Sequence, residues 1–180
     1  MSTIPLYFPS ISVDAVIEAL TAFLTPFVPT GCPIVRGWQN RVSPPFTAAA
    51  SDPLAFVKLS EVNQVDLETP QMVQSSDPSI QQATVLTPTR VDVQIDFYGL
   101  MAGDYCKAVK AVFRSPYCPD QFPDGIAPLY CGDAIRGALV TGEDQYEDRW
   151  LVTASLQYNP TVTVPQQSAT VIMVGTEVYQ

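Results

Sequence analysis

The alternation of apolar and polar residues is clearest between Val91 and Tyr98. Apolar side chains occupy positions 91, 93, 95 and 97, and polar side chains occupy positions 92, 94 and 96. A period of two predicts a strand with one face on the core. Its second face carries two aspartates and a glutamine, which suits a surface exposed to water or to a neighbouring subunit. A helical pattern follows from Gly103 to Arg114, and Ser115-Pro116 ends it.

A second helix is predicted near the N-terminus. Ser12 is a suitable N-cap for the apolar residues that follow it at helical spacing, and Pro26 and Pro29 end the pattern. Residues 1–11 include two prolines and predict an extended N-terminal arm.

Further alternating or apolar runs predict additional strands. The pattern of the second strand weakens after Glu61, and residues 116–128 predict an irregular connection. The other predicted strands are Ile34–Val42, Ala55–Ser60, Ala134–Val140 and Trp150–Tyr158.

Residues 62–89 separate the second and third predicted strands and are rich in Gln, Thr, Ser and Pro. A connection of this length in a compact domain is usually functional or mobile. Its apolar residues are more numerous than a solvated linker needs. We therefore predict a projecting β-hairpin arm, with a disordered surface loop as the alternative.

The C-terminal residues 160–180 contain two more strand-like runs, Thr161–Val164 and Thr170–Val174. They predict a terminal β-hairpin, or a β extension that pairs with a neighbouring subunit. The order of elements predicts a single α+β domain over residues 1–180, with a mostly antiparallel sheet flanked by two helices.

The charge balance argues against a nucleic-acid-binding protein. The 18 acidic and nine basic residues give a formal net charge of −9, and the basic residues are scattered. Binding to nucleic acid normally needs clustered lysine and arginine. No apolar segment approaches the roughly 20 residues that a membrane span needs, so we expect no membrane contact.

The four cysteines, at positions 32, 106, 118 and 131, form no Cys-x-x-Cys pair of the kind that zinc or redox chemistry favours. The N-terminal residues lack the basic start and apolar run of a signal peptide. We therefore expect reduced, partly buried thiols in a protein made in a reducing cytoplasm.

The chain contains no histidine. This removes Ser-His-Asp and Cys-His nucleophile systems, and also the side chain best suited to acid–base work near neutral pH. We therefore expect a structural, assembling protein that is not an enzyme and holds no cofactor.

Two groups of carboxylates deserve comparison with known chemistry. Glu143, Asp144, Glu147 and Asp148 could bind Ca²⁺ or Mg²⁺ but lack the spacing of an EF-hand loop, so we expect a solvated acidic turn. A metal-dependent hydrolase that uses these four residues is the alternative. Asp92 and Asp96 could act as a glycosidase pair, but residues four apart on a strand are separated by about 13 Å, which is too wide.

Candidate contact residues come from the first strand, the arm and the tail. Trp38 and Trp150 are more typical of core or interface anchors than of ligand-stacking residues. We hypothesise that subunit or partner contacts involve Trp38, Gln39, Asn40, Val65, Leu67, Met72, Val73, Val85, Val171 and Met173.

Three segments between Cys32 and Tyr158 together resemble the phage neck and tail-terminator family, in the same order along the chain. They are Gly37-Trp38-Gln39-Asn40 followed by Pro44-Pro45, the strand Val91–Tyr98 with its helix, and Glu147-Asp148-Arg149-Trp150 leading into an alternating strand. The chain departs from the family pattern in lacking an arginine at positions 151–153 and in a longer tail after Pro160.

The resemblance implies an α+β sandwich that forms a hexameric ring at the head-proximal end of a long phage tail. Such a ring stops tail-tube growth and docks to the neck. The implied partners are further copies of the chain, the tail tube protein and a neck or head-completion protein. The implied location is the virion, after assembly in the host cytoplasm. An acidic chain is compatible with a lumen through which genomic DNA passes without specific binding.

Two further readings of the sequence stay open. One is another ring of the neck, such as a head-completion or connector protein. The other is a monomeric binding module that uses the arm as its recognition loop.

Overall fold

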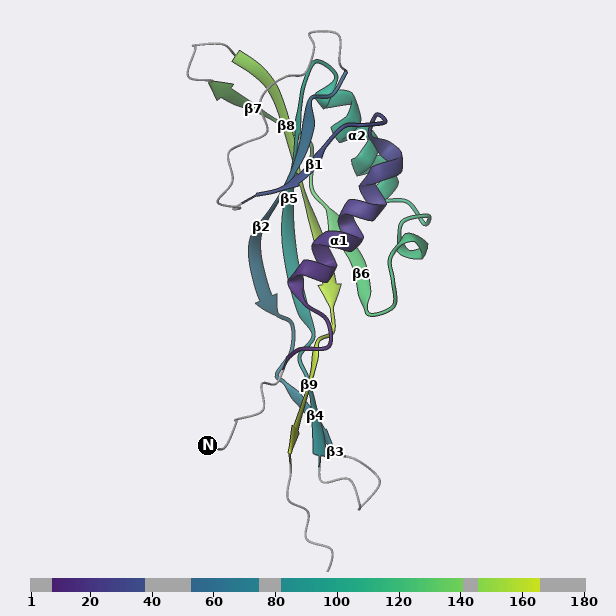
Figure 1. The fold of residues 1–180 in the computed structure, drawn as a ribbon, viewed down its shortest axis with the longest axis vertical. Coiled ribbons are helices and arrows are strands. Elements are labelled where there is room, and N and C mark those ends of the chain that lie inside the picture. The colour runs from purple at the N-terminus through teal and green to yellow at the C-terminus, as the bar shows by residue number, and fades with distance from the viewer. Residues whose placement is uncertain (1–7, 38–52, 75–81, 141–145, 166–180) are drawn as a thin grey trace, which may run out of the picture.

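The strands of the molecule run along its longest axis and form a wide body that narrows into an arm (Figure 1). The computed structural model describes residues 8–37, 53–74, 82–140 and 146–165. In the body, two helices cover one face of a six-stranded sheet, and the arm is a three-stranded sheet. This arrangement confirms the predicted α+β class.

The two helices begin and end close to their predicted bounds. Helix α1 spans Val13–Leu24, and its first turn is capped by Ser12, whose Oγ accepts a hydrogen bond from the N–H of Ala15 at 3.2 Å. Helix α2 spans Ala102–Phe113. Neither helix is long and apolar enough to cross a membrane, and the same holds for every helix in the described part of the chain.

The body sheet has the strand order β1-β2-β5-β8-β6, and β7 also pairs with β8. All of its pairings are antiparallel except that of β1 with β2. The strands are β1 Ile34–Arg36, β2 Phe56–Asp66, β5 Thr89–Tyr98, β6 Ile126–Cys131, β7 Ile135–Val140 and β8 Tyr146–Tyr158.

The core lies between the helices and the apolar face of this sheet. Leu20 and Leu24 of α1 and Val109 of α2 are fully buried with the sheet residues Ile95 and Phe97. An aromatic cluster joins the two helices at their ends. The cluster is formed by Phe23, Phe27, Phe113 and Phe122, and Phe122 follows the short 3₁₀ helix η2, Pro119–Gln121.

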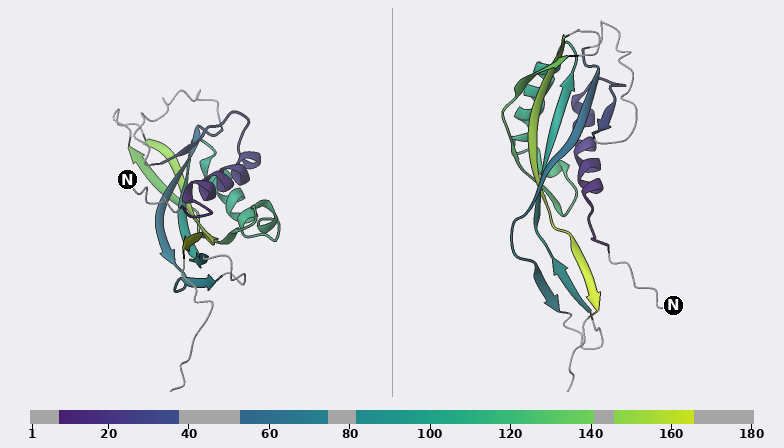
Figure 2. Two further views of the ribbon diagram at one scale, coloured as in Figure 1. Left: turned by 60° about the horizontal axis from the view of Figure 1, so that its bottom comes forward. Right: turned by 90° about the vertical axis from the view of Figure 1, so that its left-hand side faces the viewer.

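The arm sheet has the order β3-β4-β9 and continues the three central strands of the body. Its strands are β3 Gln71–Gln74, β4 Gln82–Leu86 and β9 Thr161–Pro165, so β3 follows β2, β4 precedes β5, and β9 follows β8. Figure 2 shows the strands passing from the body into the arm through a narrow waist. Each of the three crossings contains a proline, namely Pro70, Pro88 and Pro160.

The structure differs from the sequence predictions in three strands. Strand β2 continues to Asp66. From residue 62 onward both of its faces are exposed, so apolar and polar residues no longer alternate there. Strand β6 begins at Ile126, inside the predicted irregular connection. Of the predicted first strand, Ile34–Arg36 form β1 and Gly37 lies in a turn, while residues 38–42 lie outside the described residues.

The tail strand β9 pairs with β4 of its own chain, in an antiparallel register. The first of the two runs in the tail is therefore paired within the subunit along one of its edges. The second run, Thr170–Val174, lies outside the described residues.

Candidate assembly surfaces

The arm sheet has one predominantly apolar face. Met72 lies opposite Val85, and Val85 lies opposite Val162. Residues directly opposite each other in a ladder share a face of the sheet, so these three side chains form one row. Gln74, Ala83 and Val164 form the next row on the same face, with Gln74 as its one polar member. We call this set, Met72, Ala83, Val85, Val162 and Val164, the apolar arm face.

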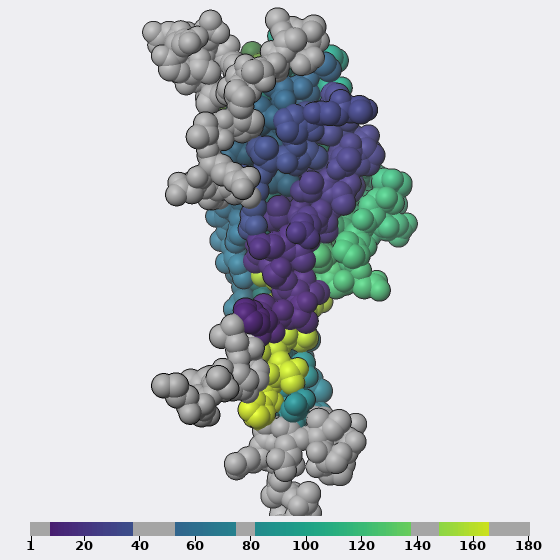
Figure 3. Space-filling view, in the orientation of Figure 1, coloured from purple at the N-terminus to yellow at the C-terminus, as the bar shows by residue number. Residues whose placement is uncertain are grey.

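The opposite face of the arm is mixed. Val73 lies opposite Thr84, which lies opposite Thr163. The edge strand β3 is the most exposed part of the arm, with Met72 and Val73 exposed by 56% and 59%. The space-filling view shows that the arm is narrower than the body (Figure 3).

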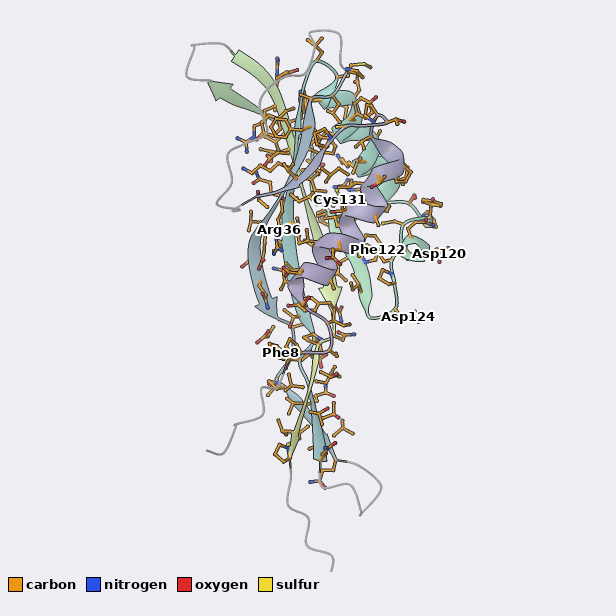
Figure 4. The ribbon with its side chains drawn as sticks, viewed as in Figure 1. Phe8, Arg36, Asp120, Phe122, Asp124 and Cys131 are labelled. Carbon is orange, nitrogen blue, oxygen red and sulfur yellow. The ribbon has the colours of Figure 1, made fainter. Side chains whose placement is uncertain are left out.

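The structure brings together only some of the hypothesised contact residues. Met72, Val73 and Val85 lie in the arm, whereas Val65 and Leu67 lie at the body end of the waist and are also exposed. Phe8, which the sequence analysis did not single out, is exposed at the same waist (Figure 4). The others, Trp38, Gln39, Asn40, Val171 and Met173, lie outside the described residues.

One lateral edge of the body sheet is the outer edge of β2. Strand β1 pairs with β2 only at residues 57–59. Among the described residues, β5 pairs with one side of β2 from Ser60 to Asp66, and no strand lies on the outer side. Val62 stands at a β-bulge in this stretch, and residues 62–66 are all exposed. Open strand edges of this kind can add a further strand.

The other lateral edge is formed by β6 and β7, which the sequence analysis did not identify as a contact surface. Leu129, Tyr130 and Ile135 are exposed there. The guanidinium group of Arg114 donates to the Cys131 carbonyl oxygen at 2.7 Å and to the Tyr130 hydroxyl at 2.8 Å. Arg114 also lies over the Tyr130 ring. The edge therefore presents apolar side chains beside a positive charge.

The polar face of β5 corrects a prediction from the sequence. Asp96 is fully buried and so is not part of a water-exposed surface. Arg149 donates to its Oδ1 from Nε at 3.1 Å and from Nη2 at 2.8 Å, and Gln94 donates to both carboxylate oxygens. Burial alone would lower the pKa of Arg149, but the hydrogen bond and charge of Asp96 raise it.

Asp92, on the same face of β5, has a separate set of partners. It accepts hydrogen bonds from the Ser155 hydroxyl at 2.6 Å and the Asn63 amide at 3.1 Å. Asp92 and Asp96 therefore accept hydrogen bonds from separate sets of donors, and they are not arranged as a catalytic pair.

The acidic turn contributes one described side chain, Asp148, which accepts a hydrogen bond from Arg136 at 2.8 Å. Glu143 and Asp144 lie outside the described residues, and the side chain of Glu147 does too. In the described ranges, no three His, Cys, Asp or Glu side chains gather as metal ligands.

All four cysteines carry free thiols, and Cys106, Cys118 and Cys131 are buried. Burial raises the pKa of the Cys106 and Cys118 thiols to about 12 and that of Cys131 to about 11. Cys131 is labelled in Figure 4. These thiols are protonated at neutral pH and behave as small core side chains.

Comparison with known families shows what kind of protein presents these surfaces. A family model described as phage neck terminator protein matches residues 14–179, which is nearly the whole chain. Comparison with curated proteins gives no match.

Proposed function

The chain belongs to the family of phage neck terminator proteins, structural proteins of the virion neck, and from this premise we propose that it forms a homomeric ring. The ring sits at the head-proximal end of the tail, ends the growth of the tail tube and joins the tail to the neck or head-completion protein. Genomic DNA passes through its lumen without specific binding, in keeping with the formal net charge of −9.

The observation that carries the proposal is the arm. It extends beyond the body along the strand axis and exposes apolar side chains from both faces of β3. Exposed apolar groups that project from the end of an elongated molecule are typical of contact surfaces. We assign the arm to the protein stacked above or below the ring, namely the tail tube protein or the neck protein.

The body supplies the lateral contact surfaces that a ring needs in addition to the arm. A cyclic ring closes by heterologous contacts, in which two different surfaces of each subunit meet. The body sheet has two unlike lateral edges, one at β2 and the other at β6 and β7. A subunit with unlike edges on its sides and an arm at its end suits a ring within a stack of rings.

The test compares arm variants with a matched control in the presence of tail tubes. In the variant Met72→Asp/Val73→Asp, two charges replace exposed apolar side chains of β3. Tyr117→Asp is the control, because Tyr117 is also exposed but lies in the loop after α2. Electron microscopy should show sixfold rings of wild-type protein on tube ends. The arm variant should cap at least tenfold fewer tubes, and the control should cap as many as wild type.

Other results would favour the remaining readings. Monomer at every concentration, both alone and with tubes, would contradict the ring. A twelvefold ring that binds the portal and ignores tail tubes would identify a connector of the neck instead.

A further inference from the structure

We propose that neighbouring copies join edge to edge, with the outer edge of β2 in one copy lying antiparallel to the outer edge of β6 in the next. This inference rests on the proposed ring and specifies the surfaces that close it. The body sheets then form one continuous wall, which leaves the arms free for the stacked partners.

The two edges lie at the same level of the sheet. One row of paired residues runs from Glu61 through Val93 and Ala154 to Cys131. A second row runs from Val65 through Arg90 and Gln157 to Ala127. The stretch of β2 whose outer edge has no described strand beside it therefore matches the full length of β6. Copies related by rotation about an axis along the strands lie at equal height, so these stretches meet without an axial shift.

The strand directions also match. Strands β2, β5, β8 and β6 are each antiparallel to the next, so β2 and β6 point in opposite directions. Rotation about an axis along the strands keeps the direction of every strand. The β2 of one copy therefore runs antiparallel to the β6 of its neighbour, and the alternation continues from subunit to subunit.

The β6 edge limits how much of a hydrogen-bonded ladder can form. Pro128 has no N–H to donate, and the register of β6 shifts between Pro128 and Tyr130. The Cys131 carbonyl already accepts from Arg114. Such features blunt an edge against unspecific strand addition. We therefore expect a short ladder around Ala127, with side chains supplying the rest of the contact.

The charges of the two edges are complementary. Glu61, Asp66 and Glu68 lie on or just after β2, and within the described ranges no cation forms an ion pair with any of them. At the other edge, Lys110 and Arg114 share the single carboxylate of Asp133. When the two edges meet at equal height, Glu61 of one copy lies opposite Cys131 of the next. Arg114 of that next copy is close by, because it donates a hydrogen bond to the Cys131 carbonyl oxygen.

Disulfide trapping tests this arrangement. Val65 and Ala127 share one row and one face of the sheet, and both are exposed, so Val65→Cys and Ala127→Cys leave the core intact. Cβ atoms of directly paired residues lie about 4.5–5.5 Å apart, close to the spacing of a disulfide. Both substitutions are made in a Cys32→Ser background, because Cys32 is the one native thiol that is not buried.

The proposal predicts a specific pattern of products under mild oxidation of assembled rings. The double variant should give a covalent ladder from dimer up to the complete ring. An equimolar mixture of the two single variants should give dimers and nothing larger, and neither single variant alone should cross-link.

Two results would overturn the inference while the ring itself stands. One is intact rings of the double variant that give no ladder. The other is a covalent dimer of Val65→Cys alone, which would show that two β2 edges meet. If no rings form, alone or on tail tubes, the proposed function fails and the edge contact fails with it.

Discussion

Arg149 of β8 donates two hydrogen bonds to one oxygen of the Asp96 carboxylate on β5, although 53 residues separate them in the sequence. Asp96 is fully buried, while about a quarter of the Arg149 side chain is exposed, at 23%. The pair therefore ties the two central strands together at a point where one charge has no access to water.

Loss of one partner of this pair should be strongly destabilising. We expect Asp96→Ala to lower the free energy of unfolding by about 3 kcal/mol, because the guanidinium group loses its counter-charge. Urea denaturation measures the effect, with Asp124→Ala as an exposed control. Asp96→Leu/Arg149→Met, which removes both charges, should recover most of the loss. A change below about 0.5 kcal/mol in Asp96→Ala would contradict this role.

Gly103 in α2 should resist replacement by alanine. A Cβ atom at this position would lie 2.8 Å from Cε2 of Trp150. The overlap should outweigh the gain in helix propensity, which is at most about 1 kcal/mol because Gly103 lies in the first turn of α2, and the net loss should be about 1 kcal/mol. In a Trp150→Leu background the same substitution should stabilise the protein, because the propensity then acts alone. Thermal unfolding of the four proteins completes the cycle, and a stabilised Gly103→Ala in the wild-type background would refute the contact.

The buried thiols predict a loss of stability in alkali. Cysteine thiols in the unfolded chain have a pKa near 9.0, whereas burial raises the pKa of Cys106 and Cys118 to about 12 in the folded chain. The unfolded state therefore binds fewer protons between pH 9 and 12, and stability falls as pH rises through this window, by at most about 1.4 kcal/mol per pH unit for each thiol.

Urea denaturation at several values between pH 8 and pH 11 measures this slope. Cys118→Ala removes one titrating thiol, so its stability should fall less steeply with pH than that of wild type, even if its stability at pH 8 is lower. Parallel slopes for the two proteins would show that this thiol does not contribute.

Reversal of charge at the β2 edge should weaken ring formation. Under the proposed edge contact, Glu61→Lys places a cation in the row that faces Arg114 of the next copy, and we expect at least tenfold weaker assembly at low salt. The difference should shrink as salt screens the charges. Glu18→Lys makes the same charge change on the exposed face of α1 and should assemble as wild type. Analytical ultracentrifugation at two salt concentrations checks both variants, and equal losses in the two would point to net charge as the cause.

The elements with a clear local period could be predicted from the sequence. The cap at Ser12 and the spacing after it indicate α1, and the alternation from Val91 to Tyr98 indicates β5. Strand β6 escaped prediction because Pro128 interrupts it and its neighbours Leu129 and Tyr130 are both exposed. The burial of Asp96 also escaped, because it depends on the register that places Arg149 beside it, and no local pattern encodes that register.

The candidate contact surfaces were only partly predictable, for the same reason. The apolar residues of the arm stand out in a polar segment, and so the sequence suggests them as contact residues. The two lateral edges are defined by which strands lack a neighbour, which is a property of the assembled sheet. The proposed proximity of Glu61 and Arg114 can be seen only when the paired residues of β2, β5, β8 and β6 are aligned.

The waist at Pro70, Pro88 and Pro160 has a mechanical consequence. Proline cannot donate to a strand ladder, and all three strands that cross the waist carry one there. Two backbone hydrogen bonds between these crossings use proline carbonyls as acceptors, from Leu67 to Pro88 and from Thr87 to Pro160. Because each crossing strand lacks one N–H donor at its proline, we expect the arm to lean more easily than the core beneath it deforms. In the proposed ring, arms that lean in this way would fit a neighbouring ring of different pitch or diameter, as is required where a tail joins a neck.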